Sequence, residues 1–170
     1  MKNLTLTLLL ILPLSLAAQS DVYASFEFDP NKAFSIIDNP RTEMDHNGLD
    51  FDFEIGARGN KIGMYIFYGR FENANYQNYG VGLDYYLAKG YRYDIGVGAN
   101  IHNIMRHQTI GNASNMAWAT YLGWSVRSRY TYWILPKIGV SGVIQYTRRP
   151  DINVGGIVEG RVGVVVKVGR

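Results

Sequence analysis

The chain contains eight stretches in which apolar and polar residues alternate one by one. The last stretch, Ile152 to Val168, shows this most clearly: its even positions are aliphatic apart from two glycines, and its odd positions carry charged and small residues. A period of two predicts a β-strand with one apolar and one polar face. Strands of globular domains usually have about 5–6 residues, whereas a tilted strand that crosses a bilayer needs about 9–11. The length of this stretch therefore favours a strand that spans a membrane.

The same alternation recurs in seven earlier stretches. They are Val22 to Asp29, Leu49 to Ala57, Ile62 to Phe71, Tyr79 to Leu87, Tyr91 to about Ile104, about Met116 to Val126, and Lys137 to Thr147. Tight turn signals such as Arg58-Gly59-Asn60-Lys61 alternate with longer polar segments such as Asn31 to Gly48. Short turns on one side and longer loops on the other are typical of membrane barrels. The pattern predicts an all-β fold, an eight-stranded antiparallel up-and-down transmembrane β-barrel.

Two barrels agree with this alternation, and they differ in which face points inward. A soluble lipocalin-like carrier would bury the apolar face, whereas a membrane barrel turns it toward lipid. The polar face holds most of the glycines, which suit a crowded lumen, and the apolar face carries tyrosine and tryptophan near strand ends, as interfacial girdles do. We therefore expect these side chains to face lipid: Phe51, Phe53, Val81, Leu83, Ile95, Val97, Leu122, Trp124, Val140, Val162 and Val164.

The opposite face should place charges of both signs in the lumen. These residues are Glu27, Asp52, Glu54, Asp84, Arg92, Asp94, Arg127, Lys137, Glu159, Arg161 and Lys167. Charges removed from bulk water need partners, and an eight-stranded interior is filled by side chains. A salt-bridged lumen is the preferred interpretation, and a narrow path for small solutes is the alternative.

The N-terminus has the features of an export signal. Lys2 precedes an apolar run from Leu4 to Leu16, and Ala17-Ala18-Gln19 offers small residues for cleavage. We expect residues 1–19 to be removed and residues 20–170 to form the barrel. Of the 17 Lys and Arg residues, removal of Lys2 leaves 16 against 14 Asp and Glu, and the basic residues are scattered. This balance gives no indication of nucleic-acid binding.

Few residues suggest chemistry. The chain has no cysteine and three histidines, and no spacing indicates a metal site or a cofactor motif. A lipid-modifying barrel enzyme would have to use His102, His107, Ser114 or Ser125, and no motif supports one. We expect no catalytic activity. Arg148-Arg149 could meet lipopolysaccharide phosphates, and Phe34-Ser35-Ile36-Ile37 could contact a protein partner.

The runs Leu49-Asp50-Phe51-Asp52-Phe53-Glu54-Ile55 and Tyr91-Arg92-Tyr93-Asp94-Ile95-Gly96-Val97-Gly98 carry a resemblance to known proteins. In architecture, the chain resembles the small eight-stranded outer-membrane proteins of the OmpA-transmembrane-domain and OmpX type. The end of the signal resembles those of Bacteroidota outer-membrane proteins. The resemblance implies a bacterial outer-membrane location, contact with its lipids and a structural or surface-loop role. One departure is the ending Val168-Gly169-Arg170, where that type usually has an aromatic residue.

Overall fold

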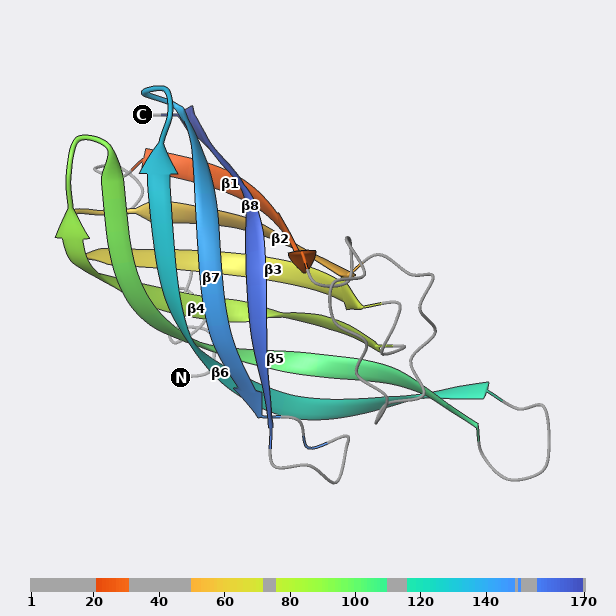
Figure 1. The fold of residues 1–170 in the computed structure, drawn as a ribbon. Coiled ribbons are helices and arrows are strands. Elements are labelled where there is room, and N and C mark those ends of the chain that lie inside the picture. The colour runs from red at the N-terminus through yellow and green to blue at the C-terminus, as the bar shows by residue number, and fades with distance from the viewer. Residues whose placement is uncertain are drawn as a thin grey trace, which may run out of the picture.

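The computed structural model describes residues 21–30, 50–71, 76–109, 116–148, 150 and 156–169. The expected signal at 1–19, the expected loop at 31–48, Arg149 and Ser114 lie outside these residues, as does the Leu49 expected to open the second strand. Eight strands occupy most of the described residues (Figure 1). They are β1 (Asp21–Phe28), β2 (Asp50–Arg58), β3 (Ile62–Phe71), β4 (Tyr76–Lys89), β5 (Tyr93–Thr109), β6 (Met116–Trp133), β7 (Ile138–Arg148) and β8 (Ile157–Gly169).

Each strand pairs with its neighbours in sequence, and β8 pairs with β1, so the sheet closes on itself. All eight pairings are antiparallel. This confirms the expected closed eight-stranded up-and-down barrel. Closure gives each strand a partner on both sides, which an open sheet cannot do for its edges.

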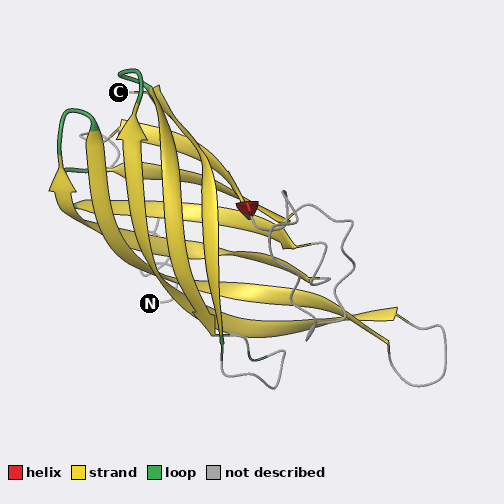
Figure 2. Ribbon diagram, in the orientation of Figure 1, coloured by secondary structure: helices red, strands yellow, loops and turns green. Residues whose placement is uncertain are grey.

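The two ends of the barrel differ. At one end, which we call the turn end, β1 begins, β8 finishes, and three short turns join β2–β3, β4–β5 and β6–β7. Backbone hydrogen bonds tighten these turns. Gly59 N–H donates to Ile62 O at 2.9 Å and Gly90 N–H to Tyr93 O at 2.6 Å, and Leu135 and Ile138 exchange a reciprocal pair at 2.9 and 3.3 Å. Figure 2 shows these turns in green, with the segments that are not described mostly at the other end, which we call the loop end.

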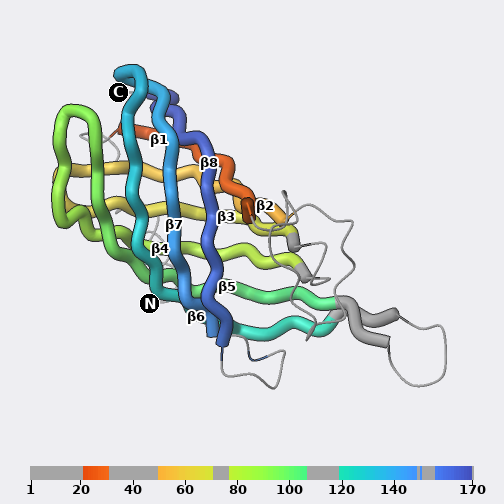
Figure 3. Tube along the Cα trace, in the orientation of Figure 1, coloured from red at the N-terminus to blue at the C-terminus, as the bar shows by residue number. Residues whose placement is uncertain are grey.

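Strands β5 and β6 are the longest, with 17 and 18 residues. They continue past their neighbours at the loop end (Figures 1 and 3). Several expected boundaries were wrong. β4 runs from Tyr76 to Lys89 instead of from Tyr79 to Leu87, and β5 runs from Tyr93 to Thr109 instead of from Tyr91 to about Ile104. β6 continues to Trp133 instead of ending at Val126. Among the described residues β8 begins at Ile157, and its expected start at Ile152 lies outside them.

The polarity of the barrel is inverted relative to a soluble protein. Polar side chains such as Glu27, Thr131 and Ser125 have exposed fractions of 0%, whereas Leu122 and Val158 are each 73% exposed. The lipocalin-like arrangement, with its apolar face inward, is therefore wrong for this chain. Within the described residues, no helix is long and apolar enough to cross a bilayer.

Candidate functional site

The middle of the lumen is built around Arg127 of β6. Its guanidinium donates two hydrogen bonds to Asp84, from Nε to Oδ1 at 2.9 Å and from Nη2 to Oδ2 at 2.7 Å. Its Nη1 also donates to Glu54 Oε1. The guanidinium carbon lies 3.7 Å from the centre of the Tyr65 ring. A planar guanidinium that pairs with two carboxylates and stacks on a ring is strongly positioned.

Arg129, two residues along β6, extends this arrangement. Its Nη2 lies 2.5 Å from Glu27 Oε1 and 2.8 Å from Glu54 Oε2. Glu54 therefore bridges the two arginines, and Ser141 Oγ donates to Glu27 at 3.1 Å. We call Arg127, Arg129, Glu27, Glu54 and Asp84 the central ion cluster. It joins β1, β2, β4 and β6 across the lumen.

A second cluster lies on the loop side of the first and is organised by Arg161 of β8. Arg161 Nη1 donates to Asp52 Oδ2 at 3.0 Å, and its Nη2 donates to Gln145 Oε1 at 2.9 Å. Gln145 continues into neutral contacts with Ser125 and Thr147 at 3.3 Å and 3.0 Å. The expected Glu159 joins more loosely, with its Oε2 3.8 Å from Arg161 Nη1. Polar contacts thus continue across β2, β6, β7 and β8.

An aromatic box closes the lumen near the turn end. The Arg58 guanidinium lies 5.4, 5.0 and 5.1 Å from the ring centres of Tyr23, Tyr86 and Trp133. Arg58 also pairs with Asp94 at 2.6 Å, and Trp133 Nε1–H donates to the same carboxylate at 2.7 Å. Beside this box, Lys167 forms an ion pair with Asp21 at 3.2 Å. The buried cation is satisfied by a carboxylate and by ring faces together.

The structure distributes the expected lumen charges unevenly. Seven are buried in the interior: Glu27, Asp52, Glu54, Asp84, Asp94, Arg127 and Arg161. Glu159 and Lys167 are half-buried. The expectation was wrong for Arg92 and Lys137, which are exposed. Both lie in turns, because β5 begins only at Tyr93 and β7 only at Ile138.

Two interior cations, Arg58 and Arg129, were missing from the expected set. Arg58 belongs to the predicted tight turn, and Arg129 lies beyond the expected strand end at Val126. In both cases the alternation of the sequence places the residue on the inner face. Arg58 continues the spacing Asp52, Glu54, Gly56, and Arg129 continues the spacing from Arg127. Extending the period of two by one step would have found both.

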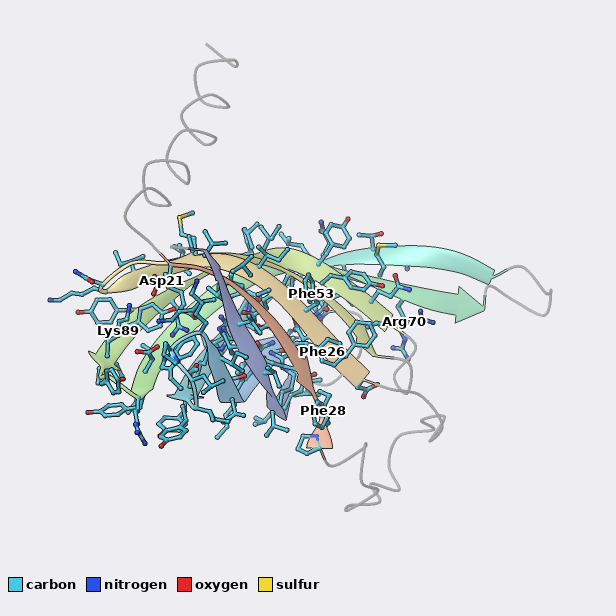
Figure 4. All side chains as sticks on the ribbon, turned by 90° about the horizontal axis from the view of Figure 1, so that it is seen from above. Asp21, Phe26, Phe28, Phe53, Arg70 and Lys89 are labelled. Carbon is cyan, nitrogen blue, oxygen red and sulfur yellow. The ribbon has the colours of Figure 1, made fainter. Side chains whose placement is uncertain are left out.

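The side chains expected to face lipid all project from the outer wall. Nine of them are exposed, and Phe51 and Ile95 are half-buried. Phe51 stacks on Phe26 with 5.5 Å between ring centres, and Phe26 and Phe53 are labelled on the wall in Figure 4. A shallow groove of about 510 Å³ on this wall is lined by residues such as Val97, Val126 and Ile144. It opens outward, so it offers no enclosed site for a carried ligand.

The two candidate catalytic residues whose side chains the structure describes, His102 and Ser125, lie in the interior and not at an outer rim. Ser125 is fully buried and donates to Thr147 Oγ1 at 3.0 Å. His102 is 2% exposed, and its Nδ1 lies 2.8 Å from Asn100 Oδ1. The side chains of His107 and Ser114 lie outside the described residues. Within the described residues, no three His, Cys, Asp or Glu side chains are grouped so as to hold a metal.

Glycines make room for these large interior groups. A Cβ at Gly163 of β8 would lie 2.7 Å from Glu27 Cα and 2.7 Å from Glu27 Cγ, whereas one at Gly160 would meet nothing within 4 Å. The contact with Glu27 Cα involves the backbone, so a rotamer change of Glu27 cannot relieve it. The two glycines lie on opposite faces of one strand.

We expect Gly163→Val to lower the free energy of unfolding by about 1–3 kcal/mol or to prevent folding, as overpacking does. Urea titration of the barrel in lipid vesicles, followed by tryptophan fluorescence, measures this. Gly160→Val is the matched control and should leave the midpoint close to that of the wild type. Equal midpoints for the two variants would contradict the close packing at Gly163.

No protein-family model and no curated protein matches the chain. Several solved structures, however, are similar to the chain in fold. The N-terminal β-barrel domain of Pseudomonas aeruginosa OprF aligns with a TM-score of 0.64 at 10% identity, over 87% of this chain and 96% of that one. Neisserial surface protein A aligns with a TM-score of 0.51 at 17% identity, over 87% and 95%.

The outer membrane protein Ail of Yersinia pestis, determined in a phospholipid bilayer nanodisc, gives a TM-score of 0.55 at 10% identity, over 86% of this chain and 98% of that one. These identities are low, so the likeness concerns the fold. It confirms the resemblance to small eight-stranded barrels. The chain therefore has the same closed-barrel fold as these proteins.

Proposed function

We propose that the chain is an integral protein of the bacterial outer membrane, with a structural or interaction role exerted at its loop end. One observation carries this proposal: the outer wall is apolar while the lumen is ionic. In hydrocarbon every backbone polar group must be satisfied internally, and a closed barrel does this. An apolar wall of this kind exposed to water would be an aggregation hazard.

The lumen supports a structural role over conduction. Across the central ion cluster, the exposed fractions are 0% for Glu27, 1% for Glu54, 2% for Asp84, 4% for Arg127 and 3% for Arg129. Side chains this inaccessible leave no solvent column between them. The same filling argues against a carrier with its ligand in the lumen. The interior position of His102 and Ser125 argues against a lipid-modifying enzyme built on those two residues.

The loop end is the better candidate for contacts with a partner. Membrane barrels of this type place short turns in the periplasm and longer loops outside, so the turn end would face inward. The extended β5–β6 hairpin would then project from the cell, and the exposed Arg148 would lie on the outer side, within reach of lipopolysaccharide phosphates. Yersinia pestis Ail has been crystallised with the heparin analogue sucrose octasulfate. A protein partner bound through the loops is the second possibility we propose.

The location is tested by fractionation and by whole-cell proteolysis. We expect the protein in the outer-membrane fraction, with a shift in gel migration on heating that reports a folded barrel in detergent. Protease added to intact cells should cut between residues 31 and 48 and spare the strands. Recovery as a detergent-free monomer from the soluble periplasm would overturn the proposal.

A further inference from the structure

Exposed cations from three separate turns gather at the turn end. We call Lys61, Lys89, Arg92 and Lys137 the basic rim. Lys61 lies between β2 and β3, Lys89 ends β4, Arg92 precedes β5 and Lys137 precedes β7. All four side chains are exposed. Figure 4 shows Lys89 at the same end as Asp21, the first residue of β1, with Phe28 and Arg70 at the opposite end.

Hydrogen bonds tie these turns to each other and to the strands. Lys89 Nζ donates to Gly59 O at 2.8 Å and so joins the β2–β3 and β4–β5 turns. Trp133 N–H donates to Arg92 O at 2.7 Å, and Lys167 N–H donates to Lys137 O at 2.8 Å. The backbones that carry the basic rim are thus held at fixed spacing around the barrel mouth.

Within the described residues, no carboxylate forms an ion pair with the basic rim. Two acidic residues lie at this end, Asp21 and Asp94. Asp21 pairs with Lys167 at 3.2 Å, and Asp94 is buried against Arg58 at 2.6 Å. The positive charge of the basic rim is therefore available to attract anionic groups outside the protein.

The loop end has a different balance. Among the described residues of this end there are three arginines, Arg70, Arg106 and Arg148, and three acidic residues, Asp29, Asp50 and Glu159. All six are engaged in polar, ring or electrostatic contacts. The excess of unmatched cations among the described residues thus belongs to one end of the barrel.

Apolar and aromatic groups surround the basic rim. Tyr91 is 90% exposed, and the β6–β7 turn exposes Ile134 and Leu135 by 61% and 54%. Tyr132 on the outer wall lies beside Arg92, whose Nη1 donates to the Tyr132 hydroxyl at 3.5 Å. Aromatic rings and long cationic side chains at one level are typical of the headgroup layer, where rings meet the interface and cations meet phosphate.

We propose that the basic rim binds the headgroups of anionic phospholipids in the leaflet at the turn end and enriches them over zwitterionic lipids. Cations near a membrane surface attract anionic headgroups, and the effect falls off within a Debye length. This inference rests on the proposed function, because it requires the barrel to lie in a bilayer.

The test uses the full barrel in phosphatidylcholine vesicles containing spin-labelled phosphatidylglycerol or spin-labelled phosphatidylcholine. Electron paramagnetic resonance measures how much of each label is immobilised at the protein. We expect the wild type to prefer phosphatidylglycerol about five-fold at low salt, the ratio that one surface cation supplies. The preference should weaken as sodium chloride rises. Inorganic phosphate and chloride at equal ionic strength should act alike, because the site recognises the net negative charge of headgroups held at the bilayer surface and not free phosphate.

The decisive variant is K61Q/R92Q/K137Q, which keeps Lys89 because Lys89 bridges two turns. We expect it to lose most of the preference, because the one cation that it keeps has its ammonium group engaged by Gly59 O. The variant R70Q/R106Q/R148Q removes the same charge at the loop end and should keep the preference. Equal loss in both variants would assign the effect to net charge and overturn the proposal, as would a wild type without preference or with a preference insensitive to salt.

Failure of this inference is distinguishable from failure of the proposed function. A barrel that inserts and shows the heat-dependent gel shift, yet immobilises both labels equally, contradicts the lipid site alone. A chain that does not enter the vesicles contradicts the membrane location itself. The gel shift also checks that each variant is folded before its lipid preference is measured.

Discussion

Replacing Arg127 with methionine is expected to lower the free energy of unfolding by about 3–5 kcal/mol, the cost of removing one partner from a buried ion pair. Arg127 pairs with both Glu54 and Asp84, and its exposed fraction is 4%. Methionine would leave both carboxylates buried, with Arg129 compensating only Glu54. Loss of the stacking on Tyr65 adds to the cost.

Urea unfolding from lipid vesicles, followed by tryptophan fluorescence, measures the effect of Arg127→Met. Arg92→Met is the matched control, since Arg92 is an exposed arginine and should change stability by less than about 0.5 kcal/mol. The triple variant R127M/E54Q/D84N removes the stranded charges together and should recover most of the loss. A large loss that the triple variant does not recover would mean that packing, not charge, dominates at this site.

The alternation of side chains was enough to predict the fold. In β2, Phe51 and Phe53 point outward while Asp52 and Glu54 point inward, as the sequence pattern requires. A period of two assigns each side chain to a face whatever the register between strands. The inference that the charged face is the inner one depended on the glycines of that face and on the tyrosine and tryptophan residues near the strand ends of the apolar face.

Strand ends were harder to predict, and errors there propagated to the site. The sixth strand was expected to end at Val126, so Arg129 fell outside it and was missed. In the structure the alternation continues through Arg129, Thr131 and Trp133, all buried. Conversely, the rim cation Lys137 was expected in the lumen because it shares the odd-numbered positions of the polar face. In the structure β7 begins only at Ile138, so Lys137 lies in the turn before it.

The pairing within the lumen could not be read from the sequence. Arg127 meets Glu54 across 73 positions and Arg129 meets Glu27 across 102. Such contacts depend on how the strands tilt and on how the closed sheet is staggered. Glycine positions depend on the same geometry: a Cβ at Gly56 would lie 2.7 Å from the Tyr23 ring, a neighbour on another strand.

Replacing Val164 with arginine tests the medium that surrounds the barrel. Val164 lies near the middle of β8, between Phe26 of β1 and Val140 of β7, and is 47% exposed on the outer wall. An arginine on the lipid face of a membrane barrel costs about 2–4 kcal/mol at the bilayer midplane and about 0–1 kcal/mol near the interface. We therefore expect Val164→Arg to lower the free energy of unfolding by about 2–4 kcal/mol, measured by urea titration from lipid vesicles.

Leu135→Arg is the matched control, because Leu135 is 54% exposed but lies in the β6–β7 turn at the end of the barrel. Its free energy of unfolding should fall by no more than about 1 kcal/mol. The two positions have nearly the same exposure and receive the same side chain, so a difference between them reports depth in hydrocarbon and not packing. If both variants instead changed stability by less than about 0.5 kcal/mol, as exposed substitutions in water do, the outer wall would face solvent. The membrane-spanning assignment would then be wrong.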